Sequence, residues 1–259
     1  MFNALTIAGS DCSGGAGIQG DLKTFAAHGI YGMSVITAVT AQNTTKVSHI
    51  QGLDSITVSK QIEAILDDIR VDSIKIGMLF NKDIILAILN TLKKYDLPKI
   101  ILDPVMVSTT GKILLEEDAR EILIKEMFPL CHLITPNINE AELLTNLSID
   151  NEEQMKRACK ELYKLGPSNI LVKGGHLQHT ACDILYDGKE FTYFNHKKIN
   201  NSNTHGTGCA LSSAIAANIS KGYNTIEAIK LAKKYITKAI EGGFPIGAGD
   251  GPVNHFIKM

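Results

Sequence analysis

The sequence predicts an α/β protein with a central, mostly parallel sheet, helices on both faces and a short hairpin. Short apolar segments of strand length alternate with amphipathic segments of helix length along the chain. The segment that follows each expected strand is polar or rich in glycine. No Pro/Ser linker, charge run or fixed-period repeat divides the sequence, so we expect one domain over residues 1–259.

The first half supplies four expected strands and three expected helices. Apolar or β-branched runs predict strands at 4–8, 34–39, 74–76 and 100–102. An amphipathic stretch at 18–28, stopped by Gly29, predicts a first helix. Apolar residues at helical spacing predict a second over 58–69, and a third that Asn81 caps and that extends to Tyr95.

The second half continues the alternation. Helices are expected at 116–127 and 151–165, the latter closed by Gly166 and Pro167, and strands at 133–134 and 170–172. Segments 182–186 and 190–194 flank Asp187 and Gly188, which predicts a hairpin. Two helices, at 207–221 and 225–241, complete the pattern.

Composition excludes several classes of protein. A formal net charge of −1, from 26 basic and 27 acidic residues, argues against nucleic-acid or membrane-surface binding. Five cysteines without a C-x-x-C pair disfavour a disulfide framework and predict a reducing, cytoplasmic location. Residues 1–7 lack the basic region of a signal peptide, and no apolar run approaches the ~20 residues that span a bilayer.

A binding site is expected where the strands end, because ligands of open α/β sheets bind at the carboxyl ends of the strands. The segments that follow the expected strands are 9–11, 42–43, 77–78, 103–104, 135–137 and 173–175. We therefore expect several of these segments to meet at one crevice.

Residues 15–20, Gly-Ala-Gly-Ile-Gln-Gly, match the dinucleotide-binding pattern G-x-G-x-x-G. That fold needs an acidic residue about 20 positions later to bind the ribose, but the second strand ends in Thr40, Ala41 and Gln42. The pattern is weak alone, and we interpret the loop as a glycine-rich approach to some other ligand.

Residues 204–209, Thr-His-Gly-Thr-Gly-Cys, lead into a helix of small residues. The first turn of a helix has free N–H groups and a positive dipole end, so the amides of Gly206, Thr207, Gly208 and Cys209 can hold a phosphoryl group, with the Thr207 hydroxyl as a further donor. The same position favours a thiolate at Cys209. A tightly packed helix start without a ligand is the alternative.

Asn137 and Glu140 stand three residues apart at an expected helix start. Their side chains can hold a hydrated Mg²⁺, or they can form an N-terminal capping box. Asp103, which follows a strand, is a further group for the metal or a turn residue before Pro104. Lys173 precedes two glycines and is placed for a phosphate contact, unless it is a surface lysine.

His176, His179 and Cys182 form an H-x-x-H-x-x-C pattern without a fourth paired ligand nearby. We interpret them as solvated loop residues rather than as a zinc site.

Ten segments, in order over nearly the whole chain, carry a family resemblance. They are Ala-Leu-Thr-Ile-Ala-Gly-Ser-Asp at 4–11, Ser-Gly-Gly-Ala-Gly at 13–17, Asp-Leu-Lys-Thr-Phe at 21–25, Thr-Ala-Gln-Asn at 40–43, Lys-Ile-Gly-Met at 75–78, Leu-Asp-Pro-Val-Met-Val at 102–107, Ile-Thr-Pro-Asn at 134–137, Val-Lys-Gly-Gly-His at 172–176, Thr-His-Gly-Thr-Gly-Cys at 204–209 and Gly-Pro-Val-Asn-His-Phe at 251–256. Together they resemble the hydroxymethylpyrimidine/phosphomethylpyrimidine kinases of thiamine biosynthesis.

The resemblance implies a ribokinase-like fold and two successive ATP- and Mg²⁺-dependent phosphorylations. The substrate would be 4-amino-5-hydroxymethyl-2-methylpyrimidine, converted to its phosphate and then to its diphosphate. A homodimer is also implied.

The resemblance also implies residue roles. Gln42 would hydrogen-bond the aminopyrimidine, in a pocket completed by Asp21, Gly9, Met78 and Val105. Lys173 would contact the ATP phosphates, with Thr207 and Asn137 also toward the nucleotide. Asn137, Glu140 and Asp103 would support Mg²⁺, and the amides of 206–209 would form the anion hole.

Two features of the resemblance bear on mechanism and loop stiffness. Cys209 stands where the wider ribokinase-like family usually has Asp, which makes it the candidate base. Cys12 stands where many relatives have proline, which we expect to alter loop stiffness.

Residues 108–111, Ser-Thr-Thr-Gly, fit a flap over the site with Gly111 as hinge.

Three rival functions remain open at this stage. A pyridoxine/pyridoxal kinase shares the fold, and Gln42 is the discriminator because an amide can both donate and accept toward an aminopyrimidine edge. A non-catalytic pyrimidine-binding protein would not need Lys173, Glu140 and the anion hole. A dinucleotide-dependent oxidoreductase would bind NAD(P)H.

Overall fold

The computed structural model describes residues 1–107, 113–175, 181–196 and 199–257. One sheet has the strand order β3-β2-β1-β4-β5-β6-β7-β8-β9. Its strands are β1 (Asn3–Asp11), β2 (Tyr31–Gln42), β3 (Val47–Gly52), β4 (Ser73–Ile76), β5 (Lys99–Leu102), β6 (Leu133–Ile134), β7 (Ile170–Val172), β8 (Ala181–Tyr186) and β9 (Phe191–His196). The six strands from β2 to β7 in this order run parallel, as expected, and β3, β8 and β9 are antiparallel additions.

The helices follow the predicted pattern closely. They are α1 (Gly17–Ala27), α2 (Ser55–Leu66), α3 (Lys82–Leu92), α4 (Glu117–Ile122), α5 (Ile138–Thr145), α6 (Glu152–Tyr163), α7 (Thr207–Ser220) and α8 (Thr225–Glu241). The Asn81 side chain accepts a hydrogen bond from the Ile84 amide, which confirms the predicted cap of α3. The helices α2 and α3 end before Ile69 and Tyr95, so these two residues, predicted to be helical, lie outside the observed helices.

Two predictions of local structure need correction. The helix predicted over 116–127 changes after Ile122 into a π-helical turn, Leu123–Met127, and then a short 3₁₀ turn that contains Pro129. Proline lacks the N–H that would continue the helix. The strand β3 was not predicted, because it pairs antiparallel at the edge of the sheet and its half-exposed residues form no apolar run.

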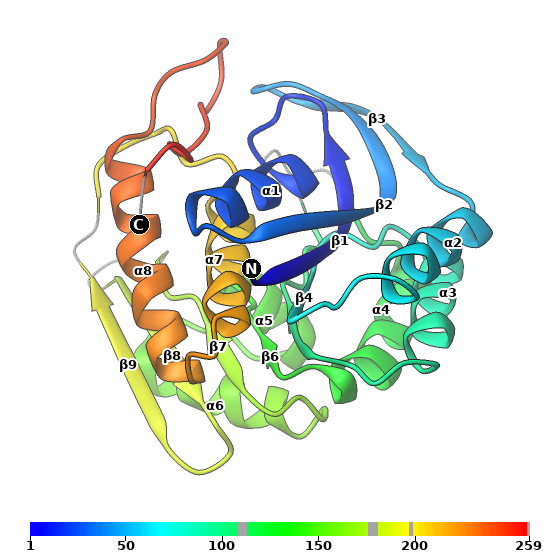
Figure 1. The fold of residues 1–259 in the computed structure, drawn as a ribbon. Coiled ribbons are helices and arrows are strands. Elements are labelled where there is room, and N and C mark those ends of the chain that lie inside the picture. Colours follow the sequence, from blue (N-terminus) through cyan, green and yellow to red (C-terminus); the bar gives the residue numbers. More distant parts are fainter. Residues whose placement is uncertain (108–112, 176–180, 197–198, 258–259) are drawn as a thin grey trace.

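Helices cover both faces of the sheet, as predicted (Figure 1). Leu5 and Ile7 of β1 pack into a core with apolar residues of α2 to α6, whereas Ala4 packs into a second core with α7 and α8. Successive side chains of a strand point to opposite faces, so a buried strand reads as a continuous apolar run. The predicted hairpin is β8–β9, with Gly188 at φ 90° in its turn.

The parallel strands place their carboxyl ends along one edge of the sheet. The segments after β1, β4, β5 and β7 therefore meet near the N-terminus of α7, which packs across β4 and β5. This arrangement brings sequence positions from Gly9 to Thr207 to one place.

Candidate functional site

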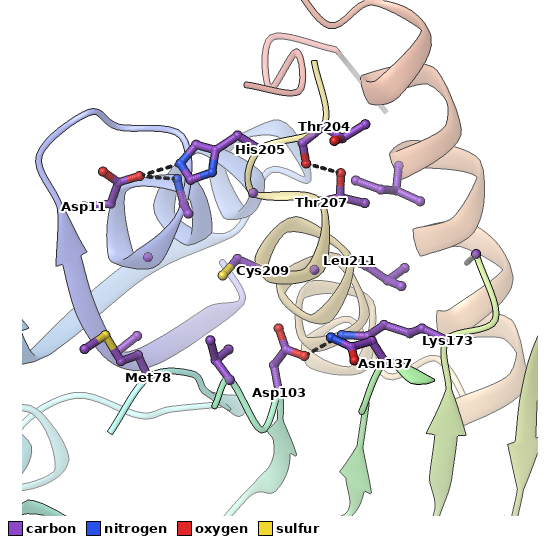
Figure 2. Close-up of a pocket in the computed structure, with 18 of the residues that line it drawn as sticks. Asp11, Met78, Asp103, Asn137, Lys173, Thr204, His205, Thr207, Cys209 and Leu211 are labelled. Atoms are coloured by element: carbon purple, nitrogen blue, oxygen red, sulfur yellow. Dashed lines mark hydrogen bonds and ion pairs between the residues drawn. The ribbon is translucent and has the colours of Figure 1, made fainter. Parts of the chain in front are cut away.

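A cavity of about 530 Å³ opens at this edge of the sheet. Its lining contains twelve of the residues proposed from sequence: Gly9, Gln42, Met78, Asp103, Val105, Asn137, Glu140, Lys173, Gly206, Thr207, Gly208 and Cys209. Figure 2 shows an Asp11–His205 pair on one side, an Asp103–Lys173 pair on another, and the Cys209 sulfur between them at the start of α7. The crevice expected at the strand ends is therefore confirmed.

Asp21 is the exception among the residues proposed for the substrate pocket, since it does not line this cavity. Its carboxylate is fully buried. It accepts hydrogen bonds from the Thr6 hydroxyl (2.6 Å), the Ser213 hydroxyl (2.6 Å) and the Lys75 ammonium (2.8 and 3.0 Å). A buried carboxylate requires such partners, and these saturate it.

Lys75 is the residue that the sequence analysis missed. It is fully buried in β4, lines the cavity and pairs with Asp21. Burial would lower its pKa, but Asp21, together with Cys209 and Asp103, raises the pKa overall, so Lys75 is charged. A lysine between two isoleucines in a buried strand was the available signal.

The N-terminus of α7 forms the glycine-rich turn in which the anion hole was predicted. Gly206 adopts φ +84°, a conformation that favours glycine, and a Cβ there would collide with the Gly15 carbonyl. Thr207 is a correction: its amide (3.1 Å) and its hydroxyl (2.6 Å) both donate to the Thr204 carbonyl. Thr207 therefore closes the turn, and the amides of Gly206, Gly208 and Cys209 remain for an anion.

The predicted thiolate at Cys209 is contradicted. Burial raises the pKa of this thiol to about 11, even though the Lys75 ammonium acts in the opposite direction. The carboxylates of Asp21 and Asp103 raise the pKa further, whereas the backbone amide of Gly17 lowers it. Desolvation disfavours the charged form more than the helix dipole favours it, so Cys209 is a neutral thiol near pH 7.

Lys173 is not a surface lysine. Its ammonium lies 2.7 Å from Asp103 Oδ1, and its side chain is 14% exposed. Burial would lower the pKa of Lys173, but Asp103 and Glu140 raise it overall. The Asp103 carboxylate also accepts from the Thr135 hydroxyl (3.1 Å), so Lys173 is a fixed positive charge at the cavity wall.

Asn137 and Glu140 form the capping box that was the alternative to a metal site. Asn137 Oδ1 accepts from the Glu140 amide (2.9 Å), and Glu140 Oε2 accepts from the Asn137 amide (2.8 Å). Burial raises the pKa of Glu140 above its ordinary value. Both residues also border the cavity, where the second carboxylate oxygen of Glu140 and the side-chain nitrogen of Asn137 take no part in the capping box.

A second group that the sequence analysis missed joins Asp11, His205 and Gln42. Asp11 Oδ2 lies 2.9 Å from His205 Nε2, and Gln42 Nε2 lies 3.4 Å from the same ring nitrogen. The exposed Cys12 thiol donates to the backbone carbonyl of Gln42 (3.1 Å) and accepts from the backbone N–H of Gln42 (3.3 Å). Cys12 therefore ties the β1–α1 loop to the end of β2.

At the far end of the cavity, Lys233 of α8 lies 2.6 Å from Asp183 Oδ2. Asp183 Oδ1 also accepts from the Gly174 amide (3.0 Å), so Asp183 links α8 to the loop that carries Lys173. The cavity thus continues from the Gln42 end to a second compartment beside α8.

Two sequence interpretations fall outside the described residues. His176 and His179 lie in 176–180, and the flap predicted at Ser108, Thr109, Thr110 and Gly111 lies in 108–112. Among the residues that the structure describes, no three His, Cys, Asp or Glu side chains are grouped as metal ligands. In the same residues, no helix is long and apolar enough to cross a membrane.

Curated relatives match nearly the whole chain. The thiamine biosynthesis bifunctional protein ThiED of Geobacter sulfurreducens is 48% identical over 256 residues, which are 98% of this chain and 52% of that protein. The hydroxymethylpyrimidine/phosphomethylpyrimidine kinase of Bacillus subtilis is 41% identical and is matched over 99% of this chain and 95% of its own length. The chain thus spans about half of the first relative and nearly all of the second.

Solved structures agree with this result. Phosphomethylpyrimidine kinase from Clostridium difficile 630 is 49% identical, with a TM-score of 0.83 over 93% of this chain and 100% of that chain. An ADP complex of Bacillus subtilis pyridoxal kinase is 38% identical, with a TM-score of 0.92 over 98% of this chain and 97% of that chain. The ribokinase-like fold is therefore confirmed.

The model of the phosphomethylpyrimidine kinase family matches residues 11–254. This range includes Lys75, the Asp103–Lys173 pair and the start of α7. From this match and its relatives, the chain belongs to the phosphomethylpyrimidine kinases, a family of phosphotransferases.

Proposed function

We propose that this protein transfers the terminal phosphoryl group of ATP to 4-amino-5-hydroxymethyl-2-methylpyrimidine, and then a second one to the phosphate so formed. The observation that carries the proposal is one continuous cavity. It joins the Gln42 end, where a pyrimidine fits, to the start of α7 and Lys173, where phosphoryl groups fit.

The pyrimidine binds between Gly9, Gln42, Met78 and Val105. A Cβ at Gly9 would stand 3.0 Å from the Met78 sulfur, so glycine there leaves room for a flat ring. The Gln42 amide supplies a donor and an acceptor to the ring edge. Asp21 acts beneath the pocket, by holding Lys75 charged at its floor.

The transferred phosphoryl group lies against the start of α7. The amides of Gly206, Gly208 and Cys209 and the Lys173 ammonium neutralise charge that develops on the phosphoryl oxygens. Phosphoryl transfer depends mainly on positioning and charge neutralisation, and these groups are fixed before substrate binds.

Mg²⁺ fits this site as a partner of the nucleotide. Glu140 and Asp103 both border the cavity with their carboxylates. Two carboxylates and waters suit Mg²⁺, which binds proteins through few side chains and many waters. When bound, it neutralises phosphate charge. Asn137 holds the helix start that positions Glu140.

Cys209 borders the reacting hydroxyl as a neutral thiol. Its proton must leave before it can act as a base, and its pKa of about 11 opposes that at neutral pH. The second transfer starts from a phosphate oxygen, which needs little help from a base. We therefore assign Cys209 chiefly to the shape of the pocket.

ATP is the proposed donor, with its base in the compartment beside α8. The Bacillus subtilis structure, a complex with ADP, supports a nucleotide in this fold. The decisive experiment follows ATP turnover with the hydroxymethylpyrimidine and separates monophosphate from diphosphate products. Accumulation of both, in that order, supports the proposal; pyrimidine binding without turnover would support the non-catalytic alternative.

Pyridoxal is the competing substrate, because pyridoxal kinases share the fold. The test is Gln42→Met, which keeps the side-chain length but removes both hydrogen-bonding groups. We expect kcat/KM for the pyrimidine to fall at least tenfold, about 1.4 kcal/mol of transition-state binding. An unchanged kcat/KM would contradict the pyrimidine assignment, whereas a larger kcat/KM for pyridoxal in the unmodified protein would favour the competitor.

We propose a cytoplasmic homodimer with one domain. All five cysteines are free thiols, which fits a reducing compartment. Light scattering coupled to size exclusion tests the dimer, with a mass of 28.1 kDa expected for a monomer.

A further inference from the structure

The side-chain amide of Gln42 lies between two polar groups at the cavity wall. Its Oε1 is 3.4 Å from the Thr40 hydroxyl oxygen, and its Nε2 is 3.4 Å from His205 Nε2. An amide oxygen accepts and an amide nitrogen donates, so each neighbour must offer the opposite capacity. The chemistry of Thr40 and His205 can therefore be checked against this orientation.

Thr40 has one hydroxyl proton. The Thr40 oxygen lies 3.0 Å from the Ser10 carbonyl, which can only accept, so the proton is donated there. Toward Gln42, the Thr40 oxygen then offers a lone pair. An amide oxygen at this place would face another acceptor.

His205 faces a carboxylate. Its Nε2 lies 2.9 Å from Asp11 Oδ2, which also accepts from the Ala16 amide, while Oδ1 accepts from the Ser13 amide and hydroxyl. Burial opposes ionisation of Asp11, but these hydrogen bonds, that of His205 foremost, lower its pKa to about 2. An ionised carboxylate only accepts, so His205 Nε2 carries a proton. An amide nitrogen facing it would meet another donor.

Turning the amide by 180° removes both like-to-like contacts: the nitrogen then faces the Thr40 lone pair, and the oxygen faces the His205 Nε2–H, which it shares with Asp11 as the longer of two acceptors. Amide oxygen and nitrogen have nearly the same shape, and their positions are assigned from the surrounding hydrogen bonds. We propose that the Gln42 amide oxygen accepts from His205 and its nitrogen donates to Thr40, and that the Asp11–His205 pair is the positioning device that fixes this orientation.

The orientation sets what the substrate meets. It leaves a lone pair of Oε1 on the His205 side and one N–H on the Thr40 side. This acceptor–donor order fits a ring edge with an exocyclic amine beside an unprotonated ring nitrogen. A 4-oxo ring edge, with a carbonyl beside a ring N–H, has the reverse order and is rejected because the amide cannot turn. This step rests on the proposed function.

His205 is itself held firmly. It is buried, its amide donates to the Gly251 carbonyl (3.1 Å), and its carbonyl accepts from the Val253 amide (3.2 Å). Backbone bonds on both sides fix the ring position. The Asp11 carboxylate then selects its protonated nitrogen, so the pair can impose an orientation on Gln42.

The kinetic test compares the 4-amino substrate with its 4-oxo analogue. The variant is Asp11→Asn, which keeps the shape but replaces a carboxylate that can only accept from His205 Nε2–H by an amide that can also donate toward it. We expect the amino-over-oxo ratio of kcat/KM to fall about tenfold, mainly through KM for the pyrimidine, while KM for ATP stays within twofold. An unchanged ratio would overturn the proposal.

A double-mutant cycle separates orientation from structure. In a Gln42→Leu background, Asp11→Asn should change the ratio less than twofold, since no amide remains to be oriented. The same tenfold change there would mean that Asp11 acts independently of Gln42. His132→Asn is the matched control: this half-buried histidine pairs with Thr225 (2.8 Å) at the other end of the sheet, and its loss should leave the ratio unchanged.

A second measurement needs no activity. Two-dimensional ¹H–¹⁵N spectra of the histidine rings report which ring nitrogen of His205 carries a proton. We expect a protonated Nε2 in the unmodified protein, whereas an unprotonated Nε2 would overturn the proposal. If the protein did not phosphorylate the pyrimidine at all, the proposed function would fail, and this spectrum would still decide the orientation.

Discussion

At the scale of single residues, the charges of the site are held by fixed partners. Lys75 pairs with Asp21 and Lys173 with Asp103, and the Asp11 carboxylate is hydrogen-bonded by His205, each with little exposed surface. A buried charge is expensive without its partner, so each pair holds its charge in one place. Substrate phosphates thus meet charges that need no rearrangement.

The Lys75–Asp21 pair leads to a stability prediction. Lys75→Met leaves the Asp21 carboxylate buried without its ion pair, and we expect a loss of about 3–5 kcal/mol in the free energy of unfolding. Urea denaturation measures it. The double variant Lys75→Met with Asp21→Asn should recover part of the loss, because no charge then remains unpaired.

Lys94→Met is the control for this experiment. Lys94 pairs with Glu63 (2.9 Å) at the surface, and its side chain is 60% exposed. Exposed ion pairs contribute about 0–1 kcal/mol, so this variant should be nearly as stable as the unmodified protein. Equal losses in both lysine variants would contradict the assigned role of the buried pair.

Cys209 gives a prediction on pH and on the two reaction steps. With a pKa of about 11, its labelling by iodoacetamide should be slow at pH 7 and rise about tenfold per pH unit up to pH 10. Cys209→Ala should slow the two phosphorylations by similar factors. A plateau of labelling below pH 8, or a loss confined to the first phosphorylation, would restore the thiolate base.

At the scale of elements, the start of α7 shows why two glycines in one turn differ. A Cβ on Gly206 meets the Gly15 carbonyl and a positive φ, whereas a Cβ on Gly208 stands 3.4 Å from Asp103 Oδ2 and 3.5 Å from Lys173 Nζ. At Gly206, the backbone conformation and the nearby Gly15 carbonyl leave no room for a side chain. The second position, Gly208, faces the cavity beside Lys173, where we propose that the phosphate binds.

This contrast predicts opposite phenotypes. Gly206→Ala should lower Tm by several degrees, because both the strained φ and the collision disturb the loop. Gly208→Ala should fold with nearly normal Tm, but its methyl group lies between the helix start and Lys173, and kcat/KM should fall more than tenfold. Thermal denaturation and steady-state kinetics of both variants check this. Normal activity of Gly208→Ala would contradict the phosphate position.

At the scale of the whole molecule, the C-terminal segment 247–257 completes the site. Gly249 donates to the Thr44 hydroxyl (3.1 Å), Gly251 and Val253 bond the backbone of His205, and Asn254 donates to the Ala239 carbonyl (2.9 Å). The segment therefore joins α8, the β2–β3 turn and the loop before α7.

Deletion of residues 247–259 tests this connection. Since His205 loses both backbone partners, we expect KM for the pyrimidine to rise at least tenfold, with a smaller rise in KM for ATP. Deletion from Phe256 onward is the control, because Phe256 is 78% exposed and the bonds to His205 remain. A full deletion that left KM for the pyrimidine unchanged would show that His205 is held by other contacts.

Much of the fold followed from local pattern. The apolar runs of β1 and β4 and the helical spacing of α8 each reflect burial along one segment, which the sequence displays directly. The edge strand β3 escaped prediction because its half-exposed residues carry no such pattern. The π turn after α4 also escaped, since it depends on how the chain meets Pro129.

The candidate site, like the fold, was predicted only in part from the sequence. The sequence by itself determined the fold class, the kinase family and twelve of the residues that line the cavity, because glycine-rich turns and strand ends are local features and the family motifs are local strings. It also allowed both interpretations of Asn137 and Glu140, which share one spacing. Only the tertiary structure decided that Asp21 lies beneath the pocket, that Lys75 forms its floor, and that Cys209 is a neutral thiol. Burial and pairing decide these properties, and both depend on residues far apart in the chain that meet only when the sheet is complete.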